Sequence, residues 1–449
     1  MFQKILIANR GEIAVRIIRA CREMGIKTVA VYSQADSEAL HTQLADEAIC
    51  IGPAASSASY LNMERLLSAT IASKADAIHP GFGFLSENSK FAEMCEKCHI
   101  TFIGPSPEVM AKMGNKSEAR RTMQMAGVPV VPGTKEAVYD AQKGLELAEK
   151  IGFPVMIKAS SGGGGKGMRV SEGPEDFEEN FKTAQMESVK GFGDDAMYLE
   201  KYVRNPKHIE FQILADKFGN VVQLGERDCS IQRNHQKVIE ESPCPVLTPE
   251  LRERMGAEAV RAAKAAGYEN AGTIEFLLDE NRNFYFMEMN TRIQVEHPVT
   301  EMVSGVDIVK EQISIAAGLP LSVKQEDIRL EGHAIECRIN AEDPAHQFRP
   351  CPGTLGEVHL PGGFGVRIDS AVYSGYEIPP YYDSMLAKVI VHDKTRAGAI
   401  DKMRSTLGEL ILDGVTTNLD FQYEILNHPD FREGKFTTAF IETHFPQRG

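Results

Sequence analysis

The amino-terminal part of the sequence, from Lys4 to Met113, alternates short apolar runs with stretches of helical periodicity. The apolar runs are KILIAN, KTVAVY, ADAIHP and ITFIGP. Runs of this length are typical of buried strands, and a helix between successive strands returns the chain so that the next strand lies parallel to the first. The sequence therefore predicts a parallel sheet wrapped by helices at the amino terminus.

This amino-terminal domain is expected to be Rossmann-like, but its first loop argues against a dinucleotide ligand. The first predicted strand ends in Asn9-Arg10-Gly11-Glu12. It lacks the glycine-rich turn that holds a pyrophosphate in dinucleotide-binding domains, and so NAD is disfavoured.

A length of 449 residues leaves room for about three domains of roughly 150 residues each. We expect them to span residues 1–113, 114–330 and 331–449. The proline- and glycine-rich segment AGVPVVPG, residues 126–133, indicates a linker into a second folding unit. The middle domain mixes strands with an alanine-rich helix from Pro249 to Ala266, and the last domain is β-rich. The expected fold class is therefore α/β followed by α+β.

Acidic side chains outnumber basic ones by 63 to 49, which gives a formal net charge of −14 at pH 7. A surface of this sign repels nucleic-acid phosphates, so nucleic acid is not an expected partner. No apolar run approaches the roughly 20 residues of a membrane span, and the amino terminus lacks a targeting leader, so we expect a cytoplasmic protein. The eight cysteines are scattered, and only Cys95 and Cys98 form a CxxC pair. No second pair accompanies them, so we interpret them as two ordinary helix residues and not as a metal or redox site.

The segment from Ser160 to Met168 places five glycines around Lys166. Because glycines have no side chain, the backbone of this segment can approach an anion closely and point its N–H groups at it. A dinucleotide loop is excluded because the next residues are typical of a strand, and a Walker A loop because Gly167 stands where Ser or Thr would bind magnesium. The segment is then either a hairpin that closes over a triphosphate, as the neighbouring Lys158 favours, or a surface loop without a ligand.

Two carboxylates and an amide lie on a predicted hairpin, TIEFLLDENRNFYFMEMN. Alternation along a strand puts Glu288 and Asn290 on one face, and pairing of Leu277 with Phe286 would also place Glu275 opposite Glu288. Like charges that face each other need a cation, and these oxygen donors suit Mg²⁺ or Mn²⁺ shared with nucleotide phosphates. The alternative is a solvated hairpin face without a metal ion.

Arg292, Glu296 and His297 follow the hairpin within the run NTRIQVEHPVTE. Arginine can grip a planar oxyanion such as bicarbonate with two hydrogen bonds, and a neighbouring carboxylate can act as the base that removes its proton. A salt-bridged loop explains Arg292 and Glu296 equally well when the run is taken alone.

Seven strings in order carry a resemblance to a known family: IANRGEIAVRI, HPGFGFLSEN, KASSGGGGKGMR, ERDCSIQRNHQK, EMNTRIQVEHPVTE, GHAIECRINAEDP and PPYYDSMLAK. Over essentially its whole length the chain resembles the ATP-grasp superfamily and, within it, the biotin carboxylases. The resemblance implies a Rossmann-like preATP-grasp domain, an ATP-grasp domain with a mobile lid over residues 131–203, and a β-rich carboxyl-terminal biotin carboxylase domain.

The resemblance also implies how ATP would be bound. Lys116 and Lys158 match phosphate-binding lysines, and the lid loop would be formed by Gly162, Gly163, Gly164, Gly165 and Gly167. Adenine would be bound by a hinge formed by Glu200, Lys201 and Val203, together with Met168 and Leu277. Ribose and phosphates would be contacted by His208, Gln232 and His235. The family's metal ligands match Glu275, Glu288 and Asn290, in agreement with the hairpin argument.

In the family's reaction, bicarbonate attacks the γ-phosphate of ATP to give carboxyphosphate, which collapses to carbon dioxide beside a deprotonated ureido nitrogen of biotin. The residues that the resemblance assigns to this reaction are Arg292 with the backbone near Gln294 and Val295 for bicarbonate, Glu296 as its base, Lys237 for the phosphate species and Arg338 for the negative oxygen of enolised biotin. Phe82 stands where relatives often have Tyr, so this chain offers no hydroxyl there.

The Met-Lys-Met motif of a biotinyl carrier domain is absent from the sequence. Biotin is therefore expected on a separate carrier protein, with carboxyltransferase subunits as further partners. The resemblance implies a homodimer, with interface positions at Arg19, Glu23, Phe364 and Arg367. Acetyl-CoA is the expected final acceptor, as in fatty-acid synthesis, with pyruvate and propionyl-CoA as alternatives. An amine-accepting ATP-grasp ligase, which Arg338 and the RIQVE run disfavour, and a non-catalytic nucleotide sensor are the rival functions.

Overall fold

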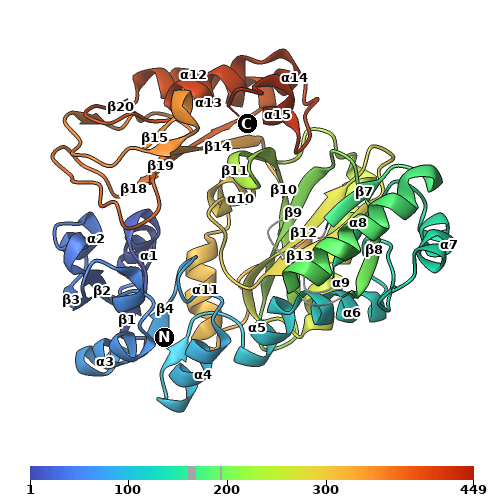
Figure 1. Ribbon diagram of the computed structural model, residues 1–449. Coiled ribbons are helices and arrows are strands. Elements are labelled where there is room, and N and C mark those ends of the chain that lie inside the picture. Colours follow the sequence, from blue (N-terminus) through green and yellow to red (C-terminus); the bar gives the residue numbers. More distant parts are fainter. Residues whose placement is uncertain (160–167, 193–194, 449) are drawn as a thin grey trace. The chain divides into compact units, whose positions relative to one another are not determined.

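The computed structural model describes residues 1–159, 168–192 and 195–448 (Figure 1). The chain divides into two compact units. The large unit contains residues 1–128, 207–276 and 288–449, and the small unit contains residues 129–206 and 277–287.

The amino-terminal sheet of the large unit is parallel, as the sequence predicts. Its strands lie in the order β3-β2-β1-β4-β5, with bounds β1 (Lys4–Ile7), β2 (Lys27–Ser33), β3 (Glu47–Gly52), β4 (Ala77–His79) and β5 (Thr101–Phe102). Ile5 of β1 packs with α1 (Gly11–Glu23), whereas Leu6 packs with α3 (Met63–Ser73) and α4 (Ser89–Lys97). Helices therefore cover both faces of this sheet, which is the arrangement expected when strands and helices alternate.

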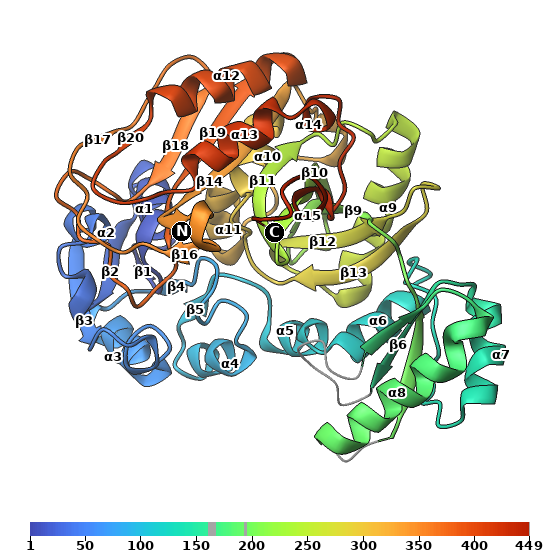
Figure 2. The same cartoon turned by 45° about the horizontal axis from the view of Figure 1, so that its top comes forward.

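A longer sheet has the order β13-β12-β9-β10-β11-β14-β19-β18, and its pairs from β9 to β18 are antiparallel (Figure 2). The bounds are β9 (Lys207–Ala215), β10 (Val221–Arg233), β11 (Gln236–Ser242), β12 (Asn270–Leu278), β13 (Phe284–Asn290), β14 (His333–Asn340), β18 (Val366–Ser370) and β19 (Met385–Asp393). Because β11 pairs with β14, with Glu240 opposite Glu336, strands on either side of residue 330 belong to one continuous sheet.

The remaining helices and short strands of the large unit are α2 (Leu40–Leu44), α5 (Pro107–Gly114), α6 (Lys116–Met125), α9 (Pro249–Ala266), α10 (His297–Ser304), α11 (Ile308–Ala316), α12 (Arg396–Glu409), α13 (Leu419–Asn427), α14 (Pro429–Arg432), α15 (Phe440–His444), β15 (Glu342–Asp343), β16 (Arg349–Pro350), β17 (Val358–His359) and β20 (Ile411–Leu412). The bounds of α9 are those that its alanine-rich sequence predicts. Thr248 caps its first turn by accepting a hydrogen bond from the Leu251 N–H, and Gly267 ends it in the left-handed conformation with φ of 69°.

The two faces of the longer sheet have different surroundings. On one face, Cys337 of β14 packs with α12 and α13, and on the other, Ala334 of β14 packs with α10. Strand alternation places Glu336 and Arg338 on the same side as Ala334. The face that α10 covers therefore combines apolar packing with buried charge, and the candidate site lies there.

The small unit is built on an antiparallel sheet with the order β7-β6-β8, where the strands are β6 (Val155–Ala159), β7 (Met168–Ser171) and β8 (Met197–Lys201). α7 (Ala141–Ile151) and α8 (Pro174–Phe192) share a core with this sheet that includes Phe177 and Phe181. Met168 begins β7, as the sequence predicts for the residue after the glycine-rich segment. The glycines of that segment, Gly162 to Gly165 and Gly167, lie outside the described residues.

The eight cysteines, all of them among the described residues, are free thiols. Cys95 lies on α4, and Cys98 is the carboxyl-terminal cap of that helix. Within the part of the chain that the structure describes, no helix combines the length and the apolar character needed to cross a membrane.

Glu241 of β11 forms a buried charge cluster with residues from the carboxyl-terminal part of the chain. Arg396 donates from Nε to its Oε2 at 2.7 Å and from Nη2 to its Oε1 at 3.0 Å, and Nε2 of His333 lies 2.6 Å from Oε2. Burial alone would raise the pKa of Glu241, but Arg396 and His333 outweigh burial and lower it to about 2. A carboxyl pKa below its unfolded value contributes stability above a pH of about 4.3, and this stability is lost as the pH falls toward the folded value.

Glu241→Gln is therefore expected to lower the free energy of unfolding by about 3 kcal/mol near neutral pH. The difference between wild type and variant should shrink as the pH falls below about 4.3, because the carboxyl of the unfolded wild type then takes up a proton that folding must release. Urea unfolding near pH 7 and near pH 3 measures the difference, and Glu409→Gln, at an exposed position of α12, is the control. An equal difference at both pH values would contradict this role of Glu241.

Candidate active site

The candidate site is assembled from separate segments of the large unit. Its side chains are His208 of β9, Gln232 of β10, Lys237 of β11, Glu275 of β12, Glu288 and Asn290 of β13, Arg292 to Glu296 of the loop before α10, and Arg338 of β14. Strand order brings these segments together, because β10 lies between β9 and β11, and β11 pairs with β14. Lys237 and Arg338, which are far apart in the sequence, thereby reach the same carboxylate.

Glu296 is that carboxylate, and 1% of its side chain is exposed. Nζ of Lys237 lies 2.6 Å from its Oε1, and Nη2 of Arg338 donates to its Oε2 at 3.0 Å. Arg338 also binds Glu240, whose Oε1 lies 2.5 Å from Nη2. Burial alone would raise the pKa of Glu296, but Lys237, Arg338 and Arg227 outweigh burial and hold it well below its ordinary value. Glu296 is therefore ionised at neutral pH.

Lys237 connects Glu296 to other buried carboxylates. Its Nζ lies 2.5 Å from Oε2 of Glu210 and 3.2 Å from Oε1 of Glu275. Burial alone would lower the pKa of Lys237, but these carboxylates and Glu296 raise it well above its ordinary value. Glu210 also pairs with Arg227, with 2.5 Å between Oε1 and Nε. Buried ions of both signs therefore compensate one another, as charges removed from water require.

The predicted metal ligands lie beside this charged group. Oε1 of Glu275 accepts hydrogen bonds from Nδ2 of Asn290 at 2.7 Å and from Nε2 of Gln294 at 2.9 Å, and its Oε2 lies 2.8 Å from Nε2 of His208. Partial burial raises the pKa of Glu288, and the negative charge of Glu275 raises it further. A divalent cation would relieve this repulsion, so the oxygen donors of Glu275, Glu288 and Asn290 fit Mg²⁺ or Mn²⁺.

Arg292 is oriented by polar neighbours, and 19% of its side chain is exposed. Its Nε donates to Oε2 of Glu87 at 2.9 Å, its Nη1 to Oε1 of Gln294 at 2.6 Å, and its Nη2 to Oδ1 of Asn290 at 3.3 Å. Gln294 and Asn290 are the side chains that also bind Glu275. Arg292 therefore belongs to the same hydrogen-bonded network as the predicted metal ligands.

Sequence reasoning missed Lys388, a fully buried residue of β19 that lies opposite Arg338. Its Nζ donates to the carbonyl oxygen of Val295 at 2.9 Å and lies 3.1 Å from Oε1 of Glu12. Burial alone would lower the pKa of Lys388, but Glu12 and nearby carboxylates raise it. The Val295 carbonyl belongs to the peptide bond that leads into Glu296, so Lys388 fixes the backbone at Glu296.

Buried charged residues of this kind can be recognised in the sequence, because they interrupt apolar strand runs. Glu210 interrupts the apolar strand run HIEFQILA, and Lys388 interrupts MLAKVIVH. A charged residue inside a strand that is buried on both faces needs a partner, so each marks a buried ion pair. The partner itself cannot be read from the run, because Lys388 pairs with Glu12 near the amino terminus.

In the small unit, four of the predicted nucleotide-binding residues lie on the sheet β7-β6-β8, namely Lys158, Met168, Glu200 and Lys201. Lys158 of β6 lies opposite Met168 of β7 and forms an ion pair with Glu200 of β8. Lys201 donates from Nζ to the carbonyls of residues 152 and 153 at 2.9 and 2.7 Å. The small unit also contains two other predicted contacts, Val203 and Leu277.

The remaining predicted nucleotide-binding residues differ in whether they contact the buried group of polar and charged side chains around Glu275 and Glu296. Gln232 is part of it, since its Nε2 lies 2.9 Å from Nδ1 of His208. His235 is exposed in the turn between β10 and β11, outside the buried group. Lys116, in the first turn of α6, is also exposed, but its charge acts on Glu288 and partly offsets the rise in the pKa of that carboxyl.

Three family models match successive parts of the chain. Their descriptions are "Biotin carboxylase, N-terminal domain" over residues 1–110, "Carbamoyl-phosphate synthase L chain, ATP binding domain" over residues 115–324, and "Biotin carboxylase C-terminal domain" over residues 336–443. The middle match is the part of the chain that contains the predicted nucleotide and metal contacts.

Known proteins match the chain over nearly its full length. It is 56% identical to biotin carboxylase 1 of Bacillus subtilis, over 99% of both chains. It is 53% identical to the 2-oxoglutarate carboxylase small subunit of Hydrogenobacter thermophilus, over 99% of this chain and 94% of the other. A solved dimer of the biotin carboxylase domain from the Hydrogenobacter enzyme, in complex with MgADP, ADP and bicarbonate, matches with a TM-score of 0.88 and 52% identity, over 100% of this chain and 99% of the other. The chain therefore belongs to the biotin carboxylase family of ATP-dependent ligases.

Proposed function

We propose that this enzyme carboxylates biotin on a separate carrier protein, with bicarbonate as the carbon source and ATP as the activating substrate. The products are carboxybiotin, ADP and phosphate. The observation that carries the proposal is the buried Glu296 held between Lys237 and Arg338, which sets a base between two cations that can stabilise anions. The MgADP and bicarbonate bound in the similar Hydrogenobacter structure support this choice of ligands.

Glu296 is the proposed base for bicarbonate. Lys237 and Arg338 hold its pKa well below the range in which a carboxylate is an effective base at neutral pH. A bound bicarbonate ion and a developing negative oxygen on biotin would share these two cations. The pKa of Glu296 would then rise, so the base becomes effective only when its substrates are in place.

Arg292 and the backbone of residues 294–295 are proposed to hold the bicarbonate. Once Glu296 takes the proton, a bicarbonate oxygen attacks the γ-phosphorus of ATP, and the new O–P bond forms as the bond to ADP breaks. The resulting carboxyphosphate breaks its C–O bond to give carbon dioxide and phosphate. The phosphate takes the ureido proton of biotin, and the freed nitrogen bonds to the carbon. Lys237 stabilises the phosphate species, and Arg338 the negative biotin oxygen.

Glu275, Glu288 and Asn290 would hold Mg²⁺ or Mn²⁺, which neutralises charge on the ATP phosphates. The other contacts to ATP are proposed as the sequence predicts. They are Lys116, Lys158, Gly162, Gly163, Gly164, Gly165, Gly167, Met168, Glu200, Lys201, Val203, His208, Gln232, His235 and Leu277.

Cleavage of ATP by the purified chain tests the proposed function. We expect cleavage to require bicarbonate and to rise when free biotin is added. Stimulation by an amine instead of biotin would favour an amine-accepting ATP-grasp ligase. Binding of ATP without any cleavage would favour a nucleotide sensor, which has no need of the base that Glu296 supplies.

The proposed final acceptor is acetyl-CoA, so that the chain would serve fatty-acid synthesis in the cytoplasm together with a biotin carrier and carboxyltransferase subunits. A similar protein from Methanothermobacter thermautotrophicus is named as a pyruvate carboxylase subunit, so pyruvate is retained as an alternative acceptor, together with propionyl-CoA. The biotinylated protein that copurifies with this chain distinguishes them. A carrier from an acetyl-CoA carboxylase supports the proposal, and a carrier from another carboxylase contradicts it.

We also propose a homodimer formed through Arg19, Glu23, Phe364 and Arg367. The exposure of Phe364 supports it, because 98% of this large apolar residue is accessible to solvent. Light scattering should give the mass of two chains, and the mass of a single chain would contradict the proposal.

Lys388→Met is expected to raise the KM for bicarbonate about tenfold, the effect of losing roughly one buried charge-assisted hydrogen bond. The substitution removes the donor to the Val295 carbonyl, so the peptide bond that leads into Glu296 loses its fixed position. The KM for ATP should change much less. Steady-state kinetics with each substrate varied in turn measures both values.

A second variant separates positioning by Lys388 from a general effect on folding. Lys388→Met leaves Glu12 without its cation, although burial already raises the pKa of Glu12 to about 7, so it can take up a proton. Lys388→Met/Glu12→Gln removes that charge, and it should fold like wild type with the same raised KM for bicarbonate. Equal increases in the KM values for ATP and bicarbonate would contradict the positioning role.

A further inference from the structure

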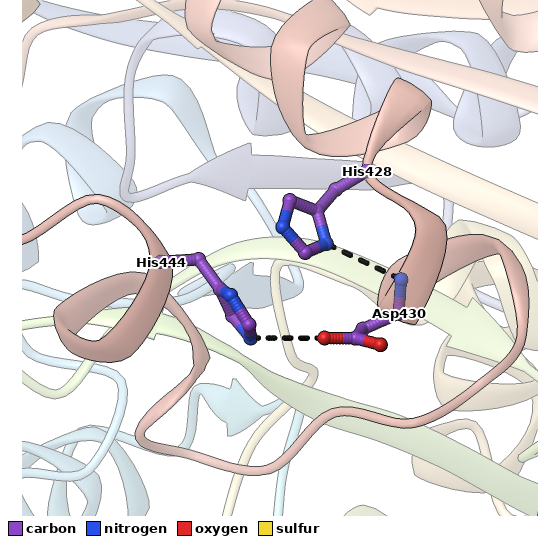
Figure 3. A group of neighbouring side chains, drawn as sticks. All are labelled: His428, Asp430 and His444. Atoms are coloured by element: carbon purple, nitrogen blue, oxygen red, sulfur yellow. Dashed lines mark hydrogen bonds and ion pairs between the residues drawn. The ribbon is translucent and has the colours of Figure 1, made fainter.

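A group of side chains near the carboxyl terminus has no part in the proposed reaction. His428 and Asp430 lie where α13 leads into α14, and His444 is the last residue of α15 (Figure 3). The ligand atoms that these residues offer all lie within 4.8 Å of one another. Two imidazoles beside a carboxylate are a common donor set for zinc and related transition metals.

The spacing of these donors fits a small metal ion. Nε2 of His444 lies 3.3 Å from Oδ2 of Asp430. Two ligands at about 2.1 Å from a tetrahedral ion lie roughly 3.4 Å apart, so this pair already has the spacing of neighbouring ligands. The rings of His428 and His444 lie 4.2 Å apart between centroids. The imidazole of His428 is therefore close to an ion that His444 and Asp430 would bind.

Aromatic packing holds both imidazoles in place. The buried ring of Phe440 lies 5.2 Å from the ring of His428 and 4.8 Å from the ring of His444. Phe445 packs against His428 as well, with 6.0 Å between centroids. Side chains that are already ordered lose less conformational entropy when an ion binds, so this packing favours binding.

We propose that His428, Asp430 and His444 form a zinc site that fastens α15 to the start of α14. Zinc is favoured over Mg²⁺ because imidazole nitrogens supply two of the three donors. The side chains of His444 and Asp430 are 27% and 39% exposed, so water can complete the coordination. An ion at this place ties the carboxyl-terminal helix to the body of the large unit.

Zinc binding requires one local rearrangement. Nδ1 of His428 accepts a hydrogen bond from the Asp430 N–H at 3.2 Å, which leaves the ring proton on Nε2. Coordination through Nε2 needs that proton on Nδ1, so the contact with the Asp430 N–H is lost on binding. The contact is long and caps a single-turn helix, so its loss is small beside the gain of a zinc–imidazole bond.

Equilibrium dialysis of the full chain against micromolar Zn²⁺, followed by metal analysis, tests the proposal. The proteins compared are the wild type, the double variant His428→Asn/His444→Asn and the control His346→Asn. Asparagine suits position 428 because it can still cap α14. His346 is a matched control, since it lies 2.6 Å from a carboxylate of Asp343 but belongs to no group of three donors within the described part of the chain.

The double variant should bind one zinc ion fewer per chain than the wild type, and His346→Asn should bind as many as the wild type. Zinc should also raise the melting temperature of the wild type more than that of the double variant. Any zinc at the catalytic carboxylates is common to all three proteins and cancels in the difference. Equal zinc counts in the wild type and the double variant would overturn the proposal, as would an equal loss in His346→Asn. Neither readout involves biotin or ATP, so this test stands apart from that of the proposed function.

Discussion

Glu296→Ala is expected to lower the rate of biotin carboxylation by about 100-fold or more, while ATP binding is retained. Glu296 lies between Lys237 and Arg338, so its loss removes the base and the anion that orients both cations. The adenine contacts are assigned to residues of the small unit, which the substitution leaves unchanged. Initial rates of carboxylation and the dissociation constant for ATP, measured on one preparation, check both parts.

Two further variants distinguish loss of the base from loss of a buried carboxylate. Glu296→Gln keeps the size of the side chain but cannot take a proton, so it should be nearly as inactive as Glu296→Ala. Glu311→Gln replaces a buried glutamate of α11 that binds Ser322 and has no part in the site, so it should keep wild-type activity. Unchanged carboxylation in Glu296→Ala would contradict the assignment of the base.

Glu288→Lys is expected to abolish metal-dependent turnover without unfolding the chain. Burial and the charge of Glu275 both raise the pKa of Glu288, so a lysine there would pair with Glu275 and take the place of the divalent cation. Position 288 is only half-buried, so the chain should still fold with a lysine there. Turnover over a range of Mg²⁺ and Mn²⁺ concentrations, together with a thermal melt, measures activity and folding.

The matched control for this charge reversal is Glu280→Lys, at an exposed position in the turn between β12 and β13. It changes the net charge by the same amount on the same hairpin but away from Glu275. We expect it to keep wild-type turnover at every metal concentration. Full activity of Glu288→Lys would show that Glu288 is not a metal ligand.

Local patterns predict those parts of the fold that neighbouring residues determine. The alternation of apolar runs and helical stretches before Met113 predicts the parallel sheet, and the alanine-rich sequence predicts α9 from Pro249 to Ala266. The strand that begins at Met168 follows from the residues after the glycine-rich segment. In each case the information lies in the segment itself, so no distant contact is needed.

Contacts between distant segments lie beyond such patterns. Lys237 and Arg338 reach Glu296 because β11 pairs with β14, and a strand does not specify its partner by its own sequence. These two residues were therefore predicted through the family resemblance and not from spacing. Lys388 and Glu12 were missed because the burial of a charge depends on partners that only the complete fold supplies.

Transfer of labelled carbon from bicarbonate to biotin is the most direct test of whether this chain carboxylates biotin. The purified chain is incubated with isotope-labelled bicarbonate, ATP, Mg²⁺ and free biotin, and labelled carboxybiotin is measured beside the ADP formed. We expect labelled carboxybiotin that requires ATP and is reduced about 100-fold or more in Glu296→Ala. Cleavage of ATP with no label on biotin would contradict the assignment of this chain as a biotin-carboxylating enzyme.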